Sequence, residues 1–145
     1  MLELMDELSR IHFMLESIGF ESGEADYAAM YSVVESIRQL ESSRKAVPLS
    51  FRWFEAHWES DVGSPGPFVH FIEEDPDYVQ PLEESLRRRP TRQTVLMVNR
   101  IANIEKDSSG VAYWVSLMQE AAGHPLADIS CKELAQEFVA YQASI

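Results

Sequence analysis

The stretch from Leu82 to Asn103, LEESLRRRPTRQTVLMVNRIAN, decides the fold that we expect for this chain. It predicts two short helices separated by a sharp break, with Leu82 and Leu86 on one apolar face of the first. Pro90 enforces the break, because the residue before a proline is disfavoured in the helical conformation. Thr91 is suited to cap the second helix. The apolar positions of that helix recur at helical spacing, at Val95, Val98, Ile101 and Ala102.

Helical periodicity also extends outward from this stretch in both directions. The expected helices are Leu2 to Ile18, Gly23 to Leu40, a segment after Pro48, Val111 to Ala122, and the chain after Ser130. Their expected inward residues are Leu4, Leu8, Ile11, Leu15, Ile18, Tyr27, Met30, Tyr31, Val34, Ile37, Val111, Trp114, Val115, Met118, Ala122, Leu134, Phe138, Val139 and Tyr141. These patterns predict an all-α single domain (1-145) of about seven helices. It forms either a HEAT-like α-solenoid curl or a compact helical bundle.

Local signals set the expected helix ends and loops. Gly19 should end the first helix in the left-handed conformation. Ser130 and Glu133 should form a capping box at the start of the last helix. The segment from Phe68 to Ile72 favours helix or irregular structure, because an isolated strand would have nothing to pair with.

Composition indicates a folded globular protein, with 46% apolar and 10% aromatic residues in 145. Cys131 is the single cysteine, so an internal disulfide is impossible, which fits a reducing compartment. No apolar run is long enough to cross a membrane, and the acidic start is unlike a secretory signal. We therefore expect a cytoplasmic protein.

The charge balance is strongly acidic. Twelve basic residues against twenty-four acidic ones give a formal net charge of −12. Such a chain repels nucleic acid and anionic membrane and attracts cationic partners, although acidity also serves solubility alone. Residues 1–43 contain nine carboxylates and only two basic residues, Arg10 and Arg38. This asymmetry makes the charged surface the first candidate for binding.

A loop and an acidic segment together form the candidate partner-binding region. The loop 61–67, DVGSPGP, contains two glycines and two prolines, and four carboxylates follow within residues 73–77. Loops of this kind carry function more often than helix faces do. The candidate partner-binding residues are the carboxylates Asp61, Glu73, Glu74, Asp75 and Asp77 and the aromatic anchors Trp58, Phe68 and Tyr78. Glu21, Glu24 and Asp26 are next in line.

Four large aromatic residues lie within eight positions, at Phe51, Trp53, Phe54 and Trp58. Some of them could anchor a partner, because aromatic residues are enriched at interfaces. The alternative, which we favour, is that helices pack on opposite sides of this segment and bury them.

Catalytic and metal-binding motifs are absent from the sequence. It contains no GxGxxG, GxxxxGK[ST], HExxH, CxxC or GxSxG. His70 and Glu73 would meet on a helix, but a metal usually needs three or four ligands. Cys131, at an expected helix amino terminus, would have a lowered pKa, yet no histidine is near it in sequence. We therefore expect no enzyme activity, no cofactor and no metal.

Arginines cluster at the break, as Arg87, Arg88, Arg89 and Arg92. Compensation of the helix dipole and internal pairing with carboxylates explain them best, and a phosphate- or carboxylate-binding role is the alternative.

The pattern L-x3-L-x3-P-T-x2-T-x4-N-R-I-x-N resembles a stretch of bacterial immunity proteins, the small cytosolic antidotes of polymorphic-toxin and contact-dependent growth inhibition systems. It covers 22 of the 145 residues, at Leu82, Leu86, Pro90, Thr91, Thr94, Asn99, Arg100, Ile101 and Asn103. The resemblance implies a stoichiometric inhibitor that holds a toxic nuclease domain inactive. Within the motif, we expect Asn99 and Asn103 to satisfy neighbouring backbone groups.

These observations favour an immunity protein that occludes the basic active-site cleft of a cognate toxin domain. The expected partner is that toxin domain, with no nucleic acid and no membrane, and we expect a monomer. The alternative function is a helical adaptor or chaperone that binds a peptide or helix in an apolar groove.

Overall fold

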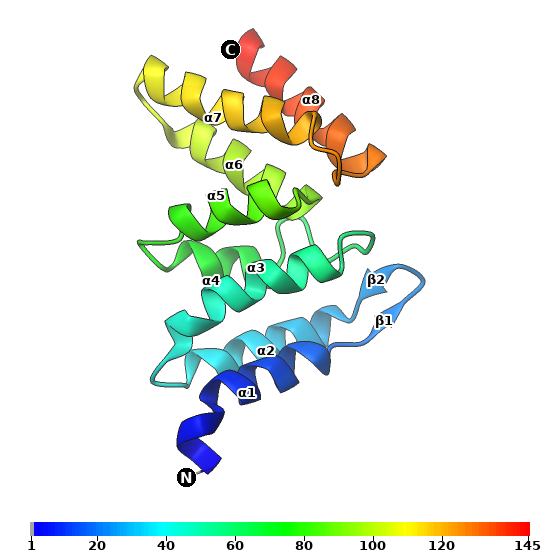
Figure 1. Ribbon diagram of the computed structural model, residues 1–145, viewed down its shortest axis with the longest axis vertical. Helices are drawn as coiled ribbons and strands as arrows, with labels where there is room; N and C mark the ends of the chain where they lie inside the picture. The colour runs from blue at the N-terminus through cyan, green and yellow to red at the C-terminus, as the bar shows by residue number, and fades with distance from the viewer. Residues whose placement is uncertain (1) are drawn as a thin grey trace. The chain divides into compact units, whose positions relative to one another are not determined.

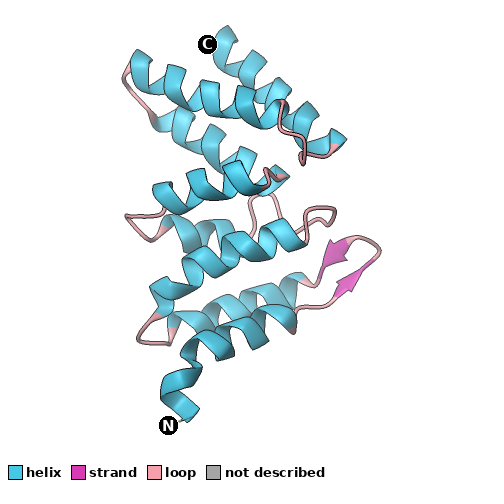
Figure 2. Ribbon diagram, in the orientation of Figure 1, coloured by secondary structure: helices cyan, strands magenta, loops and turns pink. Residues whose placement is uncertain are grey.

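Helices form nearly all of the regular structure. The computed structural model describes the backbone of residues 2–145 and the side chains from residue 7 onward. Its elements are α1 (Leu2–Glu16), β1 (Phe20–Glu21), β2 (Glu24–Ala25), α2 (Tyr27–Arg38), the 3-10 helix η1 (Ser43–Lys45), α3 (Ala46–Ala56), α4 (Pro67–Glu73), α5 (Val79–Arg88), α6 (Arg92–Ile104), α7 (Ser108–Ala122) and α8 (Ile129–Ser144). The chain is 70% helical, and the only sheet in residues 2–145 is one small hairpin (Figure 2). The expected all-α class is confirmed.

The chain divides into two compact units, Met1–Pro81 and Leu82–Ile145, here called the amino-terminal and carboxyl-terminal units. In the amino-terminal unit, α1 packs on α2 and α3, and α4 packs on α2 and α3. In the carboxyl-terminal unit, α6, α7 and α8 pack against one another in all three pairs (Figure 1). The division falls within α5. That residues 1-145 form one domain stays a prediction.

The break between α5 and α6 follows from local chemistry. Thr91 caps α6 in a capping box: its hydroxyl accepts from the Thr94 amide, and the Thr94 hydroxyl accepts from the Thr91 amide at 2.9 Å. Val95, Val98 and Ala102 are buried, as their spacing predicts. The helix–break–helix prediction is therefore confirmed. The expected partner for Asn99 and Asn103 is corrected below.

A β-hairpin replaces the expected start of the second helix. Ser22 and Gly23 take positive φ values of 54° and 79° and turn the chain between β1 and β2. Asp26 then caps α2, because its carboxylate accepts from the Ala29 amide at 3.1 Å. Gly19 does not take the left-handed conformation, so its expected role as a helix stop is wrong.

Helical periodicity in the first two expected helices places six residues correctly in the core and three residues wrongly. Ile11, Leu15, Ile18, Met30, Val34 and Ile37 are buried as expected. Leu8, Tyr27 and Tyr31 are 46%, 40% and 58% exposed, so their expected inward positions are wrong. The Tyr27 hydroxyl donates to Asp61 instead of lying in the core. The expectations for Leu4, Glu3 and Asp6 concern side chains outside the described residues.

The last two helices are present. In α7, Met118 is buried as expected and the other expected inward residues are half-buried, whereas the buried face of α8 differs from the expected one. α8 begins at Ile129 and is capped by Asp128, whose carboxylate accepts from the Cys131 amide, so the expected Ser130 capping box is wrong. Cys131, Ala135 and Gln142 are buried, whereas Tyr141 is 49% exposed. Gln142 on this face bonds to Asn99 and Asn103 of the facing segment, a contact that the apolar periodicity of α8 does not reveal.

Candidate partner-binding site

Asp61 lies against the hairpin. Its Oδ1 accepts from the Tyr27 hydroxyl and from the Gly63 amide, both at 2.9 Å. Its backbone joins β2: the Ala25 amide donates to the Asp61 carbonyl at 2.9 Å, and the Asp61 amide donates to the Gly23 carbonyl at 2.7 Å. These contacts hold Asp61 beside the amino terminus of α2.

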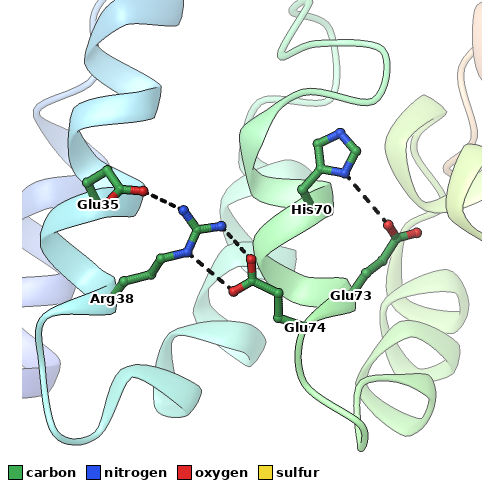
Figure 3. A network of polar contacts seen from close by, with 5 residues as sticks. All are labelled: Glu35, Arg38, His70, Glu73 and Glu74. Atoms are coloured by element: carbon green, nitrogen blue, oxygen red, sulfur yellow. Dashed lines mark hydrogen bonds and ion pairs between the residues drawn. The ribbon is translucent and has the colours of Figure 1, made fainter.

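Glu74 instead lies beside the carboxyl terminus of α2. Its two carboxylate oxygens accept from Nη2 and Nε of Arg38, at 2.6 and 3.3 Å. The same guanidinium donates through Nη1 to Glu35 at 2.5 Å (Figure 3). The hydrogen bond to Glu74 raises the pKa of Arg38, more than burial lowers it. Arg38 therefore neutralises part of the charge that we expected at this segment.

The other acidic residues of this segment make contacts that are close in sequence. Glu73 is one helical turn beyond His70, with Oε1 4.0 Å from the imidazole Nδ1, so the two meet as expected (Figure 3). Asp75 accepts from the amide of Asp77 at 2.9 Å. This contact is an Asx turn, which positions both carboxylates near the end of α4.

The predicted carboxylates therefore do not form one patch. Tyr27, the partner of Asp61, and Arg38, the partner of Glu74, are the first and last residues of α2. A helix of twelve residues at 1.5 Å per residue separates its ends by about 16 Å. The acidic residues divide into a hairpin group and a group around Arg38.

Phe68 belongs to the core. It is 0% exposed, and its ring lies 5.0 Å from Trp53 and 6.5 Å from Phe54, centroid to centroid. It therefore offers no surface to a partner in this structure, contrary to the expected anchor role. Trp58 and Tyr78 are half-buried and keep some accessible area.

The aromatic segment around α3 is mostly interior. Phe51, Trp53 and Phe54 are 0%, 5% and 1% exposed, so the favoured alternative, burial between helices, holds for these three. Five apolar rings and the half-buried imidazole of His57 form one connected cluster, in which Trp53 also contacts Phe20 and His57. Burial lowers the pKa of His57.

Each acidic group borders a cavity. The hairpin cavity has a volume of about 610 Å³ and is lined by Gly19, Phe20, Glu21, Ser22, Glu24, Ala25, Asp26 and Tyr27. The Arg38 cavity has a volume of about 350 Å³ and is lined by Arg38, Ser43, Arg44, Val47, Phe71, Glu74 and Asp75. The hairpin cavity is lined by three carboxylates and no basic side chain, whereas the Arg38 cavity has two arginines and two carboxylates.

The sequence also ranks the carboxylates that border the two cavities. Glu21, Glu24 and Asp26 are only the second choice from the sequence, and the Asp61 to Asp77 segment is the first. Spacing of i, i+3 between Glu35 and Arg38 could have revealed their ion pair. The contact between Arg38 and Glu74 spans 36 residues, and no local signal announces it.

The two units carry very different charge. The sequence up to Pro81 has sixteen acidic and five basic residues, a formal net charge of −11. The sequence from Leu82 has eight acidic and seven basic residues, a net charge of −1. Almost all of the excess negative charge therefore belongs to the amino-terminal unit.

The arginine cluster and His124 make contacts within the carboxyl-terminal unit. Arg92 donates to the Ser130 hydroxyl at 2.7 Å. His124 lies with Nε2 2.8 Å from the Arg87 carbonyl, and its Nδ1 accepts from the Leu126 amide at 3.0 Å. Arg87 and Arg88 occupy the last turn of α5, where cations favour the helix dipole.

The amide pair of the motif binds α8 rather than neighbouring backbone. Nε2 of Gln142 donates to Oδ1 of Asn99 and to Oδ1 of Asn103, both at 2.8 Å. Asn99 and Gln142 are 6% and 8% exposed. The two asparagines therefore support the scaffold by binding Gln142 of α8, which lies about forty residues further along the sequence.

Cys131 has the opposite pKa shift from the expected one. It is 0% exposed, and burial, aided by the nearby Asp128 carboxylate, raises its pKa to about 12. Desolvation of a thiolate outweighs the helix amino terminus at this position. The thiol is therefore protonated and inert in the folded state at neutral pH.

This shift predicts both reactivity and alkaline stability. Ellman's reagent at pH 8 is expected to leave the folded chain unmodified and to label one thiol per chain in guanidinium. Above the ordinary pKa of 9.0 an unfolded chain loses the thiol proton while the folded chain keeps it, so stability falls as the pH rises from 9 to 12. Cys131→Ala should remove this loss, which amounts to about 1.4 kcal/mol per pH unit. Rapid labelling of the folded chain at pH 8 would contradict the assignment.

Among the described residues, no three His, Cys, Asp or Glu side chains are grouped so that they could hold a metal ion. No helix of the described chain combines the length and the apolar character needed to span a membrane.

Comparison with protein-family models, with curated proteins and with solved structures finds no match to this chain.

Proposed function

We propose that this chain is a cytoplasmic immunity protein that binds a cognate cationic toxin domain, such as a nuclease, and covers its basic active-site cleft. The observation that carries the proposal is the concentration of charge in one unit, −11 against −1. The motif of residues 82–103 and its resemblance to immunity proteins agree with it. The protein acts as a stoichiometric inhibitor, without catalytic activity of its own.

Electrostatics explains why such a partner is suitable. A nuclease binds a phosphate backbone and so presents a basic cleft. An acidic surface complements that cleft, accelerates encounter by about 10- to 1,000-fold, and discriminates against uncharged partners. The carboxyl-terminal unit, nearly neutral, contributes little to this attraction.

The distribution of ion pairs indicates which carboxylates are available. Arg38 already engages Glu35 and Glu74, so those two contribute less to a distant partner. Glu21, Glu24 and Asp26 take part in no ion pair within 4.0 Å among the described side chains. The interface that we propose therefore includes the hairpin as well as the segment after α4.

The test compares two charge-matched variants in binding to the toxin domain encoded immediately upstream. One variant replaces exposed carboxylates of the amino-terminal unit, by Glu21→Gln, Glu24→Gln, Glu59→Gln and Asp77→Asn. The other replaces exposed carboxylates of the carboxyl-terminal unit, by Glu84→Gln, Glu120→Gln, Glu133→Gln and Glu137→Gln. Both carry the same net charge, so any difference reports position alone.

The first variant is expected to associate about tenfold more slowly at low salt, and the second to stay within about twofold of the native rate. Surface-plasmon measurements at two salt concentrations give both rates. The rate difference should shrink at high salt, because screening weakens interactions between exposed charges. Equal slowing of the two variants would contradict a binding face in the amino-terminal unit. An upstream gene that encodes no toxin, or a toxin that the chain does not bind, would contradict the immunity function itself.

An adaptor that binds an apolar peptide or helix is the second candidate function. The observation in its favour is a cavity of about 460 Å³ on α1, lined by Ser9, Arg10, Phe13 and Met14. Phe13 is 76% exposed, which is unusual for a phenylalanine. Partner binding that persists unchanged in high salt, and that Phe13→Ala abolishes, would favour this function over the first.

A further inference from the structure

We infer that the hairpin cavity binds an arginine side chain of the protein partner. This inference rests on the proposed function and deepens it, because it names the chemical group that the acidic surface recognises. The cavity has a volume of about 610 Å³, large enough for a guanidinium group with part of its aliphatic stem.

The walls of the cavity are held by backbone hydrogen bonds. The Asp26 amide donates to the Gly19 carbonyl at 2.8 Å and closes the base of the hairpin. The Ala25 amide and the Gly23 carbonyl both bond to the backbone of Asp61, which comes from a distant part of the sequence. A cavity fixed in this way loses little conformational entropy on binding, which favours affinity.

Phe20 and Tyr27 are the two aromatic residues of the lining. The Phe20 ring stacks on the His57 imidazole, with centroids 4.3 Å apart and planes 20° from parallel. The Tyr27 ring is 40% exposed, and its hydroxyl is held by Asp61 at 2.9 Å. A planar guanidinium packs favourably on aromatic rings, and more favourably than a compact ammonium does. The rings therefore favour arginine over lysine.

The three lining carboxylates supply the opposite charge. Glu21 and Glu24 pair across the hairpin, and Asp26 lies two residues after Glu24. Carboxylates without an ion-pair partner bind a guanidinium through charge-assisted hydrogen bonds. The chain itself uses this chemistry at the far end of α2, where the Arg38 guanidinium lies between Glu35 and Glu74 (Figure 3). The hairpin cavity has the carboxylates of such a site without an arginine of its own.

Nuclear magnetic resonance of the ¹⁵N-labelled full chain tests the inference with defined probes. The probes are three blocked tripeptides, acetyl-Gly-X-Gly-amide, in which X is arginine, lysine or citrulline. Citrulline has nearly the shape of arginine without its charge. We expect the arginine peptide to shift the amide resonances of Gly19, Gly23 and Ala25, with affinity at least about tenfold above that of the citrulline peptide.

Matched variants locate the site. Glu24→Gln with Asp26→Asn removes two charges from the cavity, and asparagine retains the capping of α2. Glu16→Gln with Glu41→Gln removes two exposed charges of the same unit outside the cavity. The cavity variant is expected to weaken arginine-peptide binding about five- to tenfold, and the control variant less than about twofold.

Each result has a definite meaning. Equal weakening in both variants, or shifts scattered over the acidic surface, would overturn the cavity as the site. Equal affinity for the lysine peptide would overturn the preference for arginine. If the toxin domain binds the cavity variant as tightly as the native chain, the inference fails while the proposed function stands. If no toxin domain binds but the arginine peptide behaves as described, the proposed function fails and the cavity remains a guanidinium site.

Discussion

Replacement of Phe68 by alanine is expected to lower the free energy of unfolding by about 3–5 kcal/mol. The side chain is fully buried in the amino-terminal unit. Its ring packs against Trp53 and meets Phe54 edge to face, with planes 89° apart. Truncation removes the transfer free energy of the ring and leaves a cavity that rigid helices fill only in part.

Phe13→Ala is the matched control for this prediction. Phe13 is 76% exposed on α1, so the same truncation there should change stability by less than about 0.5 kcal/mol. Chemical denaturation followed by circular dichroism measures both values. A Phe68→Ala chain with native stability but weakened partner binding would show that the residue anchors a partner after all. If Phe68→Ala lowers stability but the folded variant keeps its affinity for the partner, Phe68 serves only the core.

Replacement of Gln142 by leucine is expected to cost about 1–3 kcal/mol. Leucine has a similar volume, so the packing of α8 changes little, whereas both hydrogen bonds from Nε2 are lost. Asn99 is only 6% exposed, and its side-chain oxygen Oδ1 would lose the hydrogen-bond donor that Gln142 supplies. A buried polar atom without its partner costs its full desolvation free energy.

Gln136→Leu, on the exposed side of the same helix, is the control and should stay within about 0.5 kcal/mol of the native stability. Urea denaturation of the two variants and of Asn99→Leu completes the comparison. The double variant Gln142→Leu with Asn99→Leu should recover part of the loss, since it removes both polar partners together. If Gln142→Leu is as stable as Gln136→Leu, the amide bridge does not stabilise the carboxyl-terminal unit.

The helix–break–helix stretch follows from the sequence because its determinants are local. Pro90 restricts its neighbour, and the side chains of Thr91 and Thr94 satisfy amides three residues away. The hairpin does not follow from the sequence, because β2 needs Asp61 to complete its hydrogen bonds. Each strand has only two residues, too few for an alternating pattern.

The same contrast applies to the candidate site. The sequence identifies the acidic segments directly, and residues 73–77 have the highest density of carboxylates. A high density of carboxylates in the sequence does not mean that all of their charge is available to a partner. Arg38, which comes from α2, already binds Glu74. The position of Phe68 beside a loop likewise predicts an aromatic anchor for a partner, but in the structure Phe68 belongs to α4 and is buried in the core.

The sequence by itself determines the all-α class, the break at Pro90, the capped start of α6 and the acidic character of the chain. These depend on backbone preferences and side chains a few residues apart, or on composition alone. Only the tertiary structure decides which carboxylates stay without an ion pair and which aromatic rings face outward. It also brings Asp61 to the hairpin and Gln142 to Asn99. Those outcomes depend on contacts between distant segments, and the free energy of such contacts exists only once packing has brought the segments together.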